Sequence, residues 1–213
     1  MEEVRDIIKE IKQSFRLMMD GAVAQSMRDK GLNYHLNWGA TLPRLQAKAE
    51  EIKSSLFPLP SSLSKLAIEL WKENVRECKI LASMLMPPDE VLPEVIDIWQ
   101  EQIPSQEIAE QLAFNLYQHL PFAAEKAYQW IASDKEYDQL CGFHVLSRLF
   151  MNGQEPNERG INEYLDQALC ALQGPYPAVR KAAMQSLQRF AELGILYERL
   201  AKSATKSIDL DIF

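Results

Sequence analysis

The sequence has few of the residues from which metal and catalytic centres are usually built. It contains three histidines, three cysteines and eight glycines among 213 residues. The glycines form no phosphate-binding loop, and no His or Cys pair has the spacing of a zinc site. The cysteines, Cys78, Cys141 and Cys170, all lie inside apolar stretches, so we expect buried free thiols in a reducing compartment. No metal, disulfide or cofactor is therefore expected.

Long apolar runs are also missing. No segment approaches the roughly 18 to 20 apolar residues that a membrane-spanning helix needs. The N-terminal residues 1–5 are charged and lack the apolar core of a secretory signal. The composition, 47% hydrophobic and 25% charged, is that of a folded protein. We expect a cytoplasmic protein that has no membrane partner.

Basic charge is scarce in the middle of the chain. The formal net charge is −7, but residues 16–88 hold 10 Lys and Arg against 7 Asp and Glu, whereas residues 89–138 hold 2 against 11. Proteins that bind nucleic acid tightly owe much of their affinity to a basic face. Only the N-terminal half could supply such a face, so the balance argues against tight, general DNA binding.

Helical periodicity dominates what the sequence does contain. Similar helix starts recur near residues 43, 75, 108, 137 and 179, and they are clearest at Val75-Arg76 and Val179-Arg180. A period near 30 to 40 residues is typical of stacked helix pairs that form a solenoid with a long concave surface. We therefore expect an all-α chain without strands and one domain over residues 1–213. A break is expected at Phe57–Ser62, and frayed residues after Ser203.

Three polar features leave alternatives open. His144 lies in an apolar stretch, where a packed histidine is favoured over a catalytic one. The charged segment Glu69–Glu77 is interpreted as a solvated helix face rather than a binding face. Ser105 is a candidate N-cap, so Glu107 would lie in the first turn of the helix, where an acidic side chain is favoured by the helix dipole. Glu107 and Glu110 share one helix face, and paired carboxylates can also stabilise an oxocarbenium-like transition state. The spacing alone favours the structural interpretation.

Several segments together resemble the DNA alkylation repair (AlkD-like) family of HEAT-like repeat DNA glycosylases. The matching residues are Tyr34 and the segments 26–31, 39–45, 70–82 and 126–134, of which the last ends in Trp130-Ile131-Ala132-Ser133-Asp134. The resemblance extends from about residue 20 to residue 195. It implies a right-handed α-α superhelix of HEAT-like repeats. Active members excise N3- or N7-alkylated purines. In them, aromatic side chains and one Asp stabilise the positive charge that develops on the deoxyribose, and an Arg holds the DNA backbone.

Most of the family's catalytic positions are substituted in this chain. The two Trp positions fall on Gln106 and Glu107, and the catalytic Asp falls on Glu110, or on Gln111 in the neighbouring register. The family positions outside this segment fall on Ser26 (Tyr), Leu140 (the backbone-holding Arg) and Gln185 or Ser186 (a further cleft Trp). Only Glu110 keeps a carboxylate, so the resemblance leaves enzymatic activity uncertain.

Three functions are consistent with this pattern. The first is a DNA- or damage-binding member that binds double-stranded DNA weakly and lacks efficient base excision. Its candidate contacts are Arg28, Lys30, Arg44, Lys48, Arg76, Lys79, Arg148 and Arg180, although Arg76 and Arg180 could instead pair with acids of a neighbouring repeat. The second is a scaffold that binds a protein partner in the concave groove. The third is an active alkylpurine glycosylase that uses Glu110.

Overall fold

The protein is all-helical. The computed structural model describes residues 2–32, 34–56, 60–206 and 208, and within these ranges it contains twelve α-helices, one short 3-10 helix and no extended strand. Leu36 and Val75 form an isolated parallel bridge. The chain divides into two compact units, Met1–Leu116 and Tyr117–Phe213. The prediction of a single domain over residues 1–213 stays a prediction.

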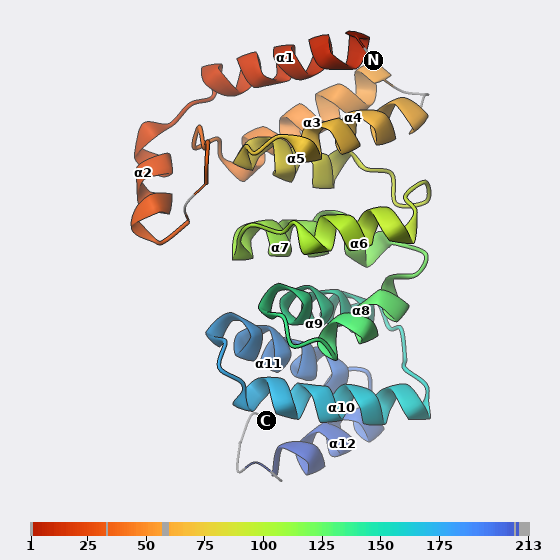
Figure 1. Cartoon of the computed structure of the whole chain (residues 1–213). Helices are drawn as coiled ribbons and strands as arrows, with labels where there is room; N and C mark the ends of the chain where they lie inside the picture. Colours follow the sequence, from red (N-terminus) through yellow and green to blue (C-terminus); the bar gives the residue numbers. More distant parts are fainter. Residues whose placement is uncertain (1, 33, 57–59, 207, 209–213) are drawn as a thin grey trace. The chain divides into compact units, whose positions relative to one another are not determined.

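The first unit contains seven helices (Figure 1). They are α1 (Glu2–Leu17), α2 (Gly21–Asp29), α3 (Leu42–Leu56), α4 (Pro60–Lys72), α5 (Arg76–Leu85), α6 (Pro93–Glu101) and α7 (Gln106–Asn115). Helix α5 lies at the centre of the unit, because α3, α4 and α7 all pack against it, and α1 packs on α4. Trp71 of α4 stacks on Trp99 of α6 with ring centroids 4.5 Å apart.

Helix α5 is buried on nearly every face. Its buried side chains include Cys78, Ile80, Leu81 and Leu85, as expected for a helix with neighbours all round. A helix in this setting would normally be apolar throughout, yet α5 opens with Arg76 and Glu77. Charged groups survive such burial only when they are paired and hydrogen-bonded.

The second unit contains the short helix η1 (Tyr117–His119) and five α-helices (Figure 1). These are α8 (Ala123–Ile131), α9 (Glu136–Met151), α10 (Glu158–Gln173), α11 (Pro177–Ala191) and α12 (Ile195–Lys206). Helix α9 packs against both α8 and α11. The close approach of α8 requires a glycine at Gly142, because a Cβ there would lie 2.7 Å from Cγ2 of Ile131 and 2.9 Å from the Ala127 carbonyl oxygen.

The repeat positions are confirmed. The predicted starts at 43, 75, 108, 137 and 179 fall within two residues of the first residues of α3, α5, α7, α9 and α11. Of these helices, α5, α9 and α11 each pack against the helix that directly precedes them. Within the described ranges, no helix combines the length and the apolar character needed to cross a membrane. No group of three His, Cys, Asp or Glu side chains there could hold a metal ion.

Some local expectations were wrong. Cys78 and Cys141 are buried free thiols, but Cys170 is exposed, because it lies on the solvent side of α10. The expected fraying after Ser203 is contradicted up to Lys206, because α12 continues to that residue and Thr205 is buried. Residues 207 and 209–213 lie outside the described residues, as do Phe57–Leu59 of the expected break at Phe57–Ser62.

Candidate nucleic-acid interface

Two consecutive charged residues open α5 and hold the connection between α2 and α3. Glu77 is fully buried, and its Oε1 accepts hydrogen bonds from the backbone N–H groups of Trp38 at 3.1 Å and Ala40 at 3.2 Å. Gly39 lies between these donors with φ +75°, and a Cβ there would come within 2.2 Å of the Asp20 carbonyl oxygen. The connection therefore depends on a buried carboxylate beneath it and on a glycine at its closest approach.

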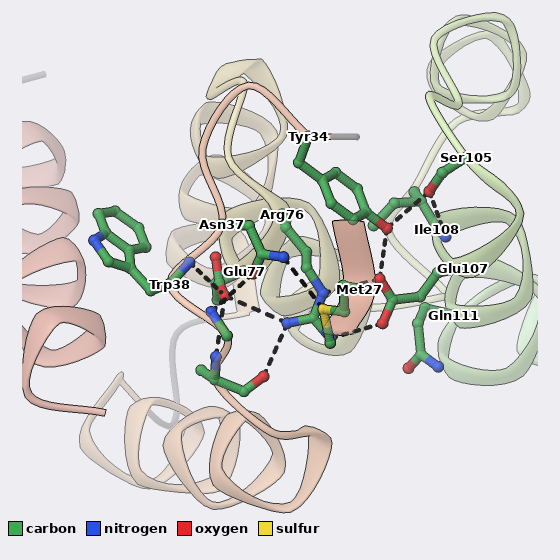
Figure 2. Close-up of polar contacts among 12 residues, drawn as sticks. Met27, Tyr34, Asn37, Trp38, Arg76, Glu77, Ser105, Glu107, Ile108 and Gln111 are labelled. Carbon is green, nitrogen blue, oxygen red and sulfur yellow. Dashed lines mark hydrogen bonds and ion pairs between the residues drawn. The ribbon is translucent and has the colours of Figure 1, made fainter. Parts of the chain in front are cut away.

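Arg76 completes this arrangement from the other side (Figure 2). Its Nη1 donates to the Ala40 carbonyl oxygen at 2.8 Å and lies 3.3 Å from Oε1 of Glu77. Its Nε and Nη2 donate to the two carboxylate oxygens of Glu107, on α7, at 2.8 and 2.6 Å. Such a two-pronged pair is the strongest form of an Arg–carboxylate contact. One guanidinium thus joins the α2–α3 connection, α5 and α7.

A chain of hydroxyl groups extends the network along the start of α7 (Figure 2). Tyr34 donates to Oε2 of Glu107 at 2.5 Å, and its oxygen lies 2.8 Å from Oγ of Ser105. Tyr34 has one hydroxyl hydrogen, and it is used in the hydrogen bond to Glu107. In the contact with Ser105 the Tyr34 oxygen is therefore the acceptor, and the Ser105 hydroxyl is the donor. The same Ser105 oxygen accepts the N–H of Ile108 at 3.4 Å and caps α7, which confirms the predicted N-cap.

The network alters the ionisation of its members. Burial alone would raise the pKa of Glu107, but the hydrogen bonds and charge of Arg76 outweigh it, and the net pKa is lowered. Burial likewise opposes the charged form of Arg76, but the contacts with Glu107 raise its pKa. Burial, followed by the Glu107 charge, raises the pKa of Tyr34. At neutral pH the lowered pKa keeps Glu107 ionised opposite the charged Arg76, and the raised pKa keeps Tyr34 neutral.

Two predicted DNA contacts are corrected by this geometry. The Arg76 side chain is only 1% exposed and fully engaged, so the alternative of pairing with an acid of the next helix pair is the one observed. Lys79 is 8% exposed, donates to the Trp71 carbonyl at 2.9 Å and lies over the Trp71 ring. Burial also lowers the pKa of Lys79. The interpretation of Glu69–Glu77 as a solvated face was wrong at its C-terminal end, because the α2–α3 connection covers it.

The remaining cleft positions in the first unit lie along α7. Gln106 is exposed, and its Nε2 donates to Oε1 of Glu110 at 2.8 Å. Glu110 and Gln111 are both half-buried. Gln111 accepts a hydrogen bond from Asn115 at 3.2 Å. Glu110 is therefore partly open to solvent, and its hydrogen-bond partner is the side-chain amide of Gln106 rather than an aromatic residue.

The other basic candidates of the first unit are on or next to α2 and α3. Arg28 and Lys30 are exposed, and Arg28 donates hydrogen bonds to Gln25 on its own helix. Arg44 is exposed and donates to the Met18 carbonyl oxygen at 3.1 Å. Lys48 is half-buried and pairs with Glu51 at 2.8 Å. Arg28, Lys30 and Arg44 therefore remain accessible to a ligand.

The second unit holds the other four predicted positions. Leu140, at the family's Arg position, is buried and offers only packing. Arg180 is half-buried and donates to the Gly174 carbonyl at 2.7 Å, which closes the turn before α11. Gln185 is exposed, and Arg148 is half-buried. These positions therefore keep two accessible polar groups and no aromatic side chain.

His144 of α9 has the properties of a packed histidine. Burial, together with the positive charges of Arg148 and Lys181, lowers its pKa to about 4. The imidazole is therefore uncharged at neutral pH and has lost the titration that makes histidine a useful acid or base there.

Sequence reasoning missed Glu77 and the hydroxyl chain as parts of one cluster. A sequence signal existed, because α5 opens with an Arg-Glu pair and continues, apart from Lys79, with apolar or small residues. Charged residues at the start of a buried helix need partners from elsewhere in the chain. The identity of those partners depends on contacts 31 to 39 residues away.

Comparisons with known proteins place these observations in context. A family profile described as DNA alkylation repair enzyme matches residues 11–195. One solved structure, described as "A new family of proteins related to the HEAT-like repeat DNA glycosylases with affinity for branched DNA structures", is similar with a TM-score of 0.73 and 16% identity. The alignment covers 93% of this chain and 81% of that one. Among the curated proteins no match was found. The structural similarity establishes a HEAT-like repeat fold.

Proposed function

Because the chain belongs to the DNA alkylation repair enzyme family, we propose that it binds duplex or branched DNA and lacks efficient excision of alkylated bases. The observation that carries this proposal is the position of Glu107. It falls where the family resemblance puts a cleft tryptophan, but its carboxylate is held by Arg76 and Tyr34. A side chain committed to an internal ion pair cannot stack against a nucleotide.

The DNA-binding half of the proposal is supported by fold and accessible charge. The structural relative is described as having affinity for branched DNA. In this chain Arg28, Lys30 and Arg44 are exposed cations near one another in sequence, at the end of α2 and the start of α3. Contacts of this kind are made to phosphates and carry no sequence information.

The first experiment measures binding and base release on the same protein. Fluorescence anisotropy with a four-way DNA junction and with a linear duplex of matched sequence, each titrated at low and raised KCl, measures affinity and its salt dependence. We expect junction binding that weakens steeply with salt. No binding to either DNA at low salt would refute the DNA role.

The second experiment tests excision under conditions that favour it. Duplex DNA that contains 7-methylguanine or 3-methyladenine is incubated with excess protein, and released base is measured by chromatography. We expect no release above the spontaneous rate. Release that is lost in Glu110→Gln, but kept in the neighbouring control Gln106→Ala, would instead establish a glycosylase that uses Glu110.

A protein-binding scaffold is the second candidate, and one surface favours it. The exposed face of α6 combines Glu94 and Glu101 with two apolar side chains, Leu92 (63% exposed) and Ile98 (53% exposed). Acidic residues around apolar ones suit a basic amphipathic partner. If the protein binds no DNA, and Ile98→Ser abolishes a purified complex with a cellular partner, this role replaces the DNA one.

A further inference from the structure

Helix α1 carries a row of four cations that the linear charge count conceals. Residues 1–16 hold four Lys and Arg against four Asp and Glu, yet the four cations, Arg5, Lys9, Lys12 and Arg16, are spaced by four, three and four residues. Side chains at this spacing line one face of a helix. We call these four residues the α1 basic row. At 1.5 Å per residue it extends for about 16 Å along the helix.

The α1 basic row is accessible and largely uncommitted. Arg5, Lys9 and Arg16 are exposed, and none of them makes an ion pair within the part of the chain that the structure describes. Lys12 pairs with Glu73 of α4. By contrast, Lys48 and Lys72 are paired with acids on their own helices. Unpaired cations in a row attract a ligand with repeated negative charge.

A groove runs beside this row. Its volume is about 860 Å³, and its lining includes Lys9, Lys12 and Arg16 of the row, the acids Asp6 and Glu10, and Trp38. The position of Trp38 is fixed, because its backbone N–H is bound by the buried Glu77 and its ring contacts Phe15. The network described above therefore holds one wall of the groove in place.

The C-terminal end of the row is apolar and exposed. Leu17 is 89% exposed and Met19 is 64% exposed, directly after Arg16. Arg44 lies next to them, because its guanidinium donates to the Met18 carbonyl oxygen. Cations that hold phosphates beside apolar side chains that contact unstacked bases are the means by which proteins bind distorted DNA. A branch point exposes such base faces, whereas a continuous duplex does not.

We propose that the α1 basic row holds the phosphate backbone of one arm of a branched DNA, with Leu17 and Met19 against the base pairs at the branch point. This inference rests on the proposed function and specifies where a second arm binds. It explains how a chain of net charge −7 attracts DNA locally, because the attraction comes from one cationic face rather than from the whole protein.

The test compares charge-matched variants on the same junction. Lys9→Gln/Arg16→Gln removes two cations from the row. The control, Arg159→Gln/Arg199→Gln, removes two exposed cations from the second unit. We expect the first variant to bind the four-way junction roughly tenfold more weakly, with a salt slope lower by about two. Asp6→Asn/Glu10→Gln should bind more tightly, because it removes the repulsion of two acids that line the same groove.

A third variant tests the apolar end of the row. In Leu17→Ser/Met19→Ser we expect the preference for the junction over the linear duplex to fall, while the salt slope stays unchanged. Both residues are exposed, so a circular-dichroism melting curve identical to wild type confirms that the fold is kept. An unchanged junction preference in this variant would overturn the contact with the branch point.

The outcomes separate this inference from the proposed function. If wild-type protein binds the junction and Lys9→Gln/Arg16→Gln binds it equally well, the row is not a DNA contact but the protein still binds DNA. If wild type binds no DNA, both proposals fail. If wild type instead dimerises in sedimentation and only the row variant is monomeric, the row contacts a second copy. Its partner would then be the acidic face of α6, where Glu94, Asp97 and Glu101 repeat the spacing of Lys9, Lys12 and Arg16.

Discussion

Replacing Arg76 by Met tests whether the buried network holds the first unit together. Methionine keeps much of the length of the side chain but removes the donors to Glu107, to the Ala40 carbonyl and to Glu77. Glu77 is fully buried and would be left without its cation, and among the described residues its Oε2 already has no hydrogen-bond partner. Glu107 is less affected, because its side chain is 17% exposed and regains water.

The expected cost follows from the fate of the buried charge. Breaking a buried ion pair by removing one partner costs about 3 to 5 kcal/mol, because the remaining charge is left uncompensated. For a unit of this size, such a loss lowers the melting temperature by roughly 10 °C or more. The exposed Arg28 is the matched control, since its contacts are confined to Gln25 on its own helix. Arg28→Met should change the free energy of unfolding by less than about 0.5 kcal/mol.

Urea unfolding followed by tryptophan fluorescence is the assay. Three of the four tryptophans, Trp38, Trp71 and Trp99, belong to the first unit, so the signal reports mainly on it. A double variant, Arg76→Met/Glu107→Gln, should lose less stability than the two single variants together, because each single change leaves a charge that the double change partly removes. If the free energy of unfolding of Arg76→Met lies within about 1 kcal/mol of that of wild type, the reasoning is refuted, because the stability of the first unit would then not depend on the cation of the network.

Two further predictions follow from single positions. The pKa of Glu107 is lowered in the folded state from its ordinary value of 4.5. The stabilisation by the Glu107 carboxylate is therefore complete above pH 4.5 and is lost as the pH falls through the lower folded-state pKa. Glu107→Gln should flatten the acid limb of a curve of unfolding free energy against pH, and an unchanged limb would contradict the ion pair. Gly142→Ala should destabilise the second unit by about 1 to 3 kcal/mol in thermal unfolding, because its Cβ meets the backbone of α8. The control Gly21→Ala has open space around it and should be neutral or stabilising, and equal effects of the two alanines would exclude close packing as the cause.

Most of the fold could be predicted because its signals are local. Apolar residues at helical spacing placed α3, α5, α7, α9 and α11 within two residues of their observed starts, and a proline lies within two residues of the start of α3, α7 and α11. The errors came where tertiary packing competed with the local pattern. Cys170 faces solvent although its surroundings in sequence are apolar.

The candidate site could be predicted only in outline. The family resemblance brought attention to residues 105–111, and helical spacing put Glu107 and Glu110 on one face. The resemblance gave no indication that Glu107 faces Arg76 while Glu110 accepts a hydrogen bond from Gln106. The cause is sequence distance, since Arg76 and Glu107 are 31 residues apart and meet only because α5 packs on α7.

The sequence by itself determined the helices, their repeat and the loss of aromatic residues at the cleft positions, because these follow from residue type and local spacing. Only the tertiary structure decided which charges are available to a ligand. Arg76 and Lys79 resemble surface cations in sequence but are enclosed by neighbouring helices and connections, whereas Arg5, Lys9 and Arg16 lie in a stretch with no net positive charge and are exposed. Accessibility depends on what packs against a side chain, and that is a property of the folded chain as a whole.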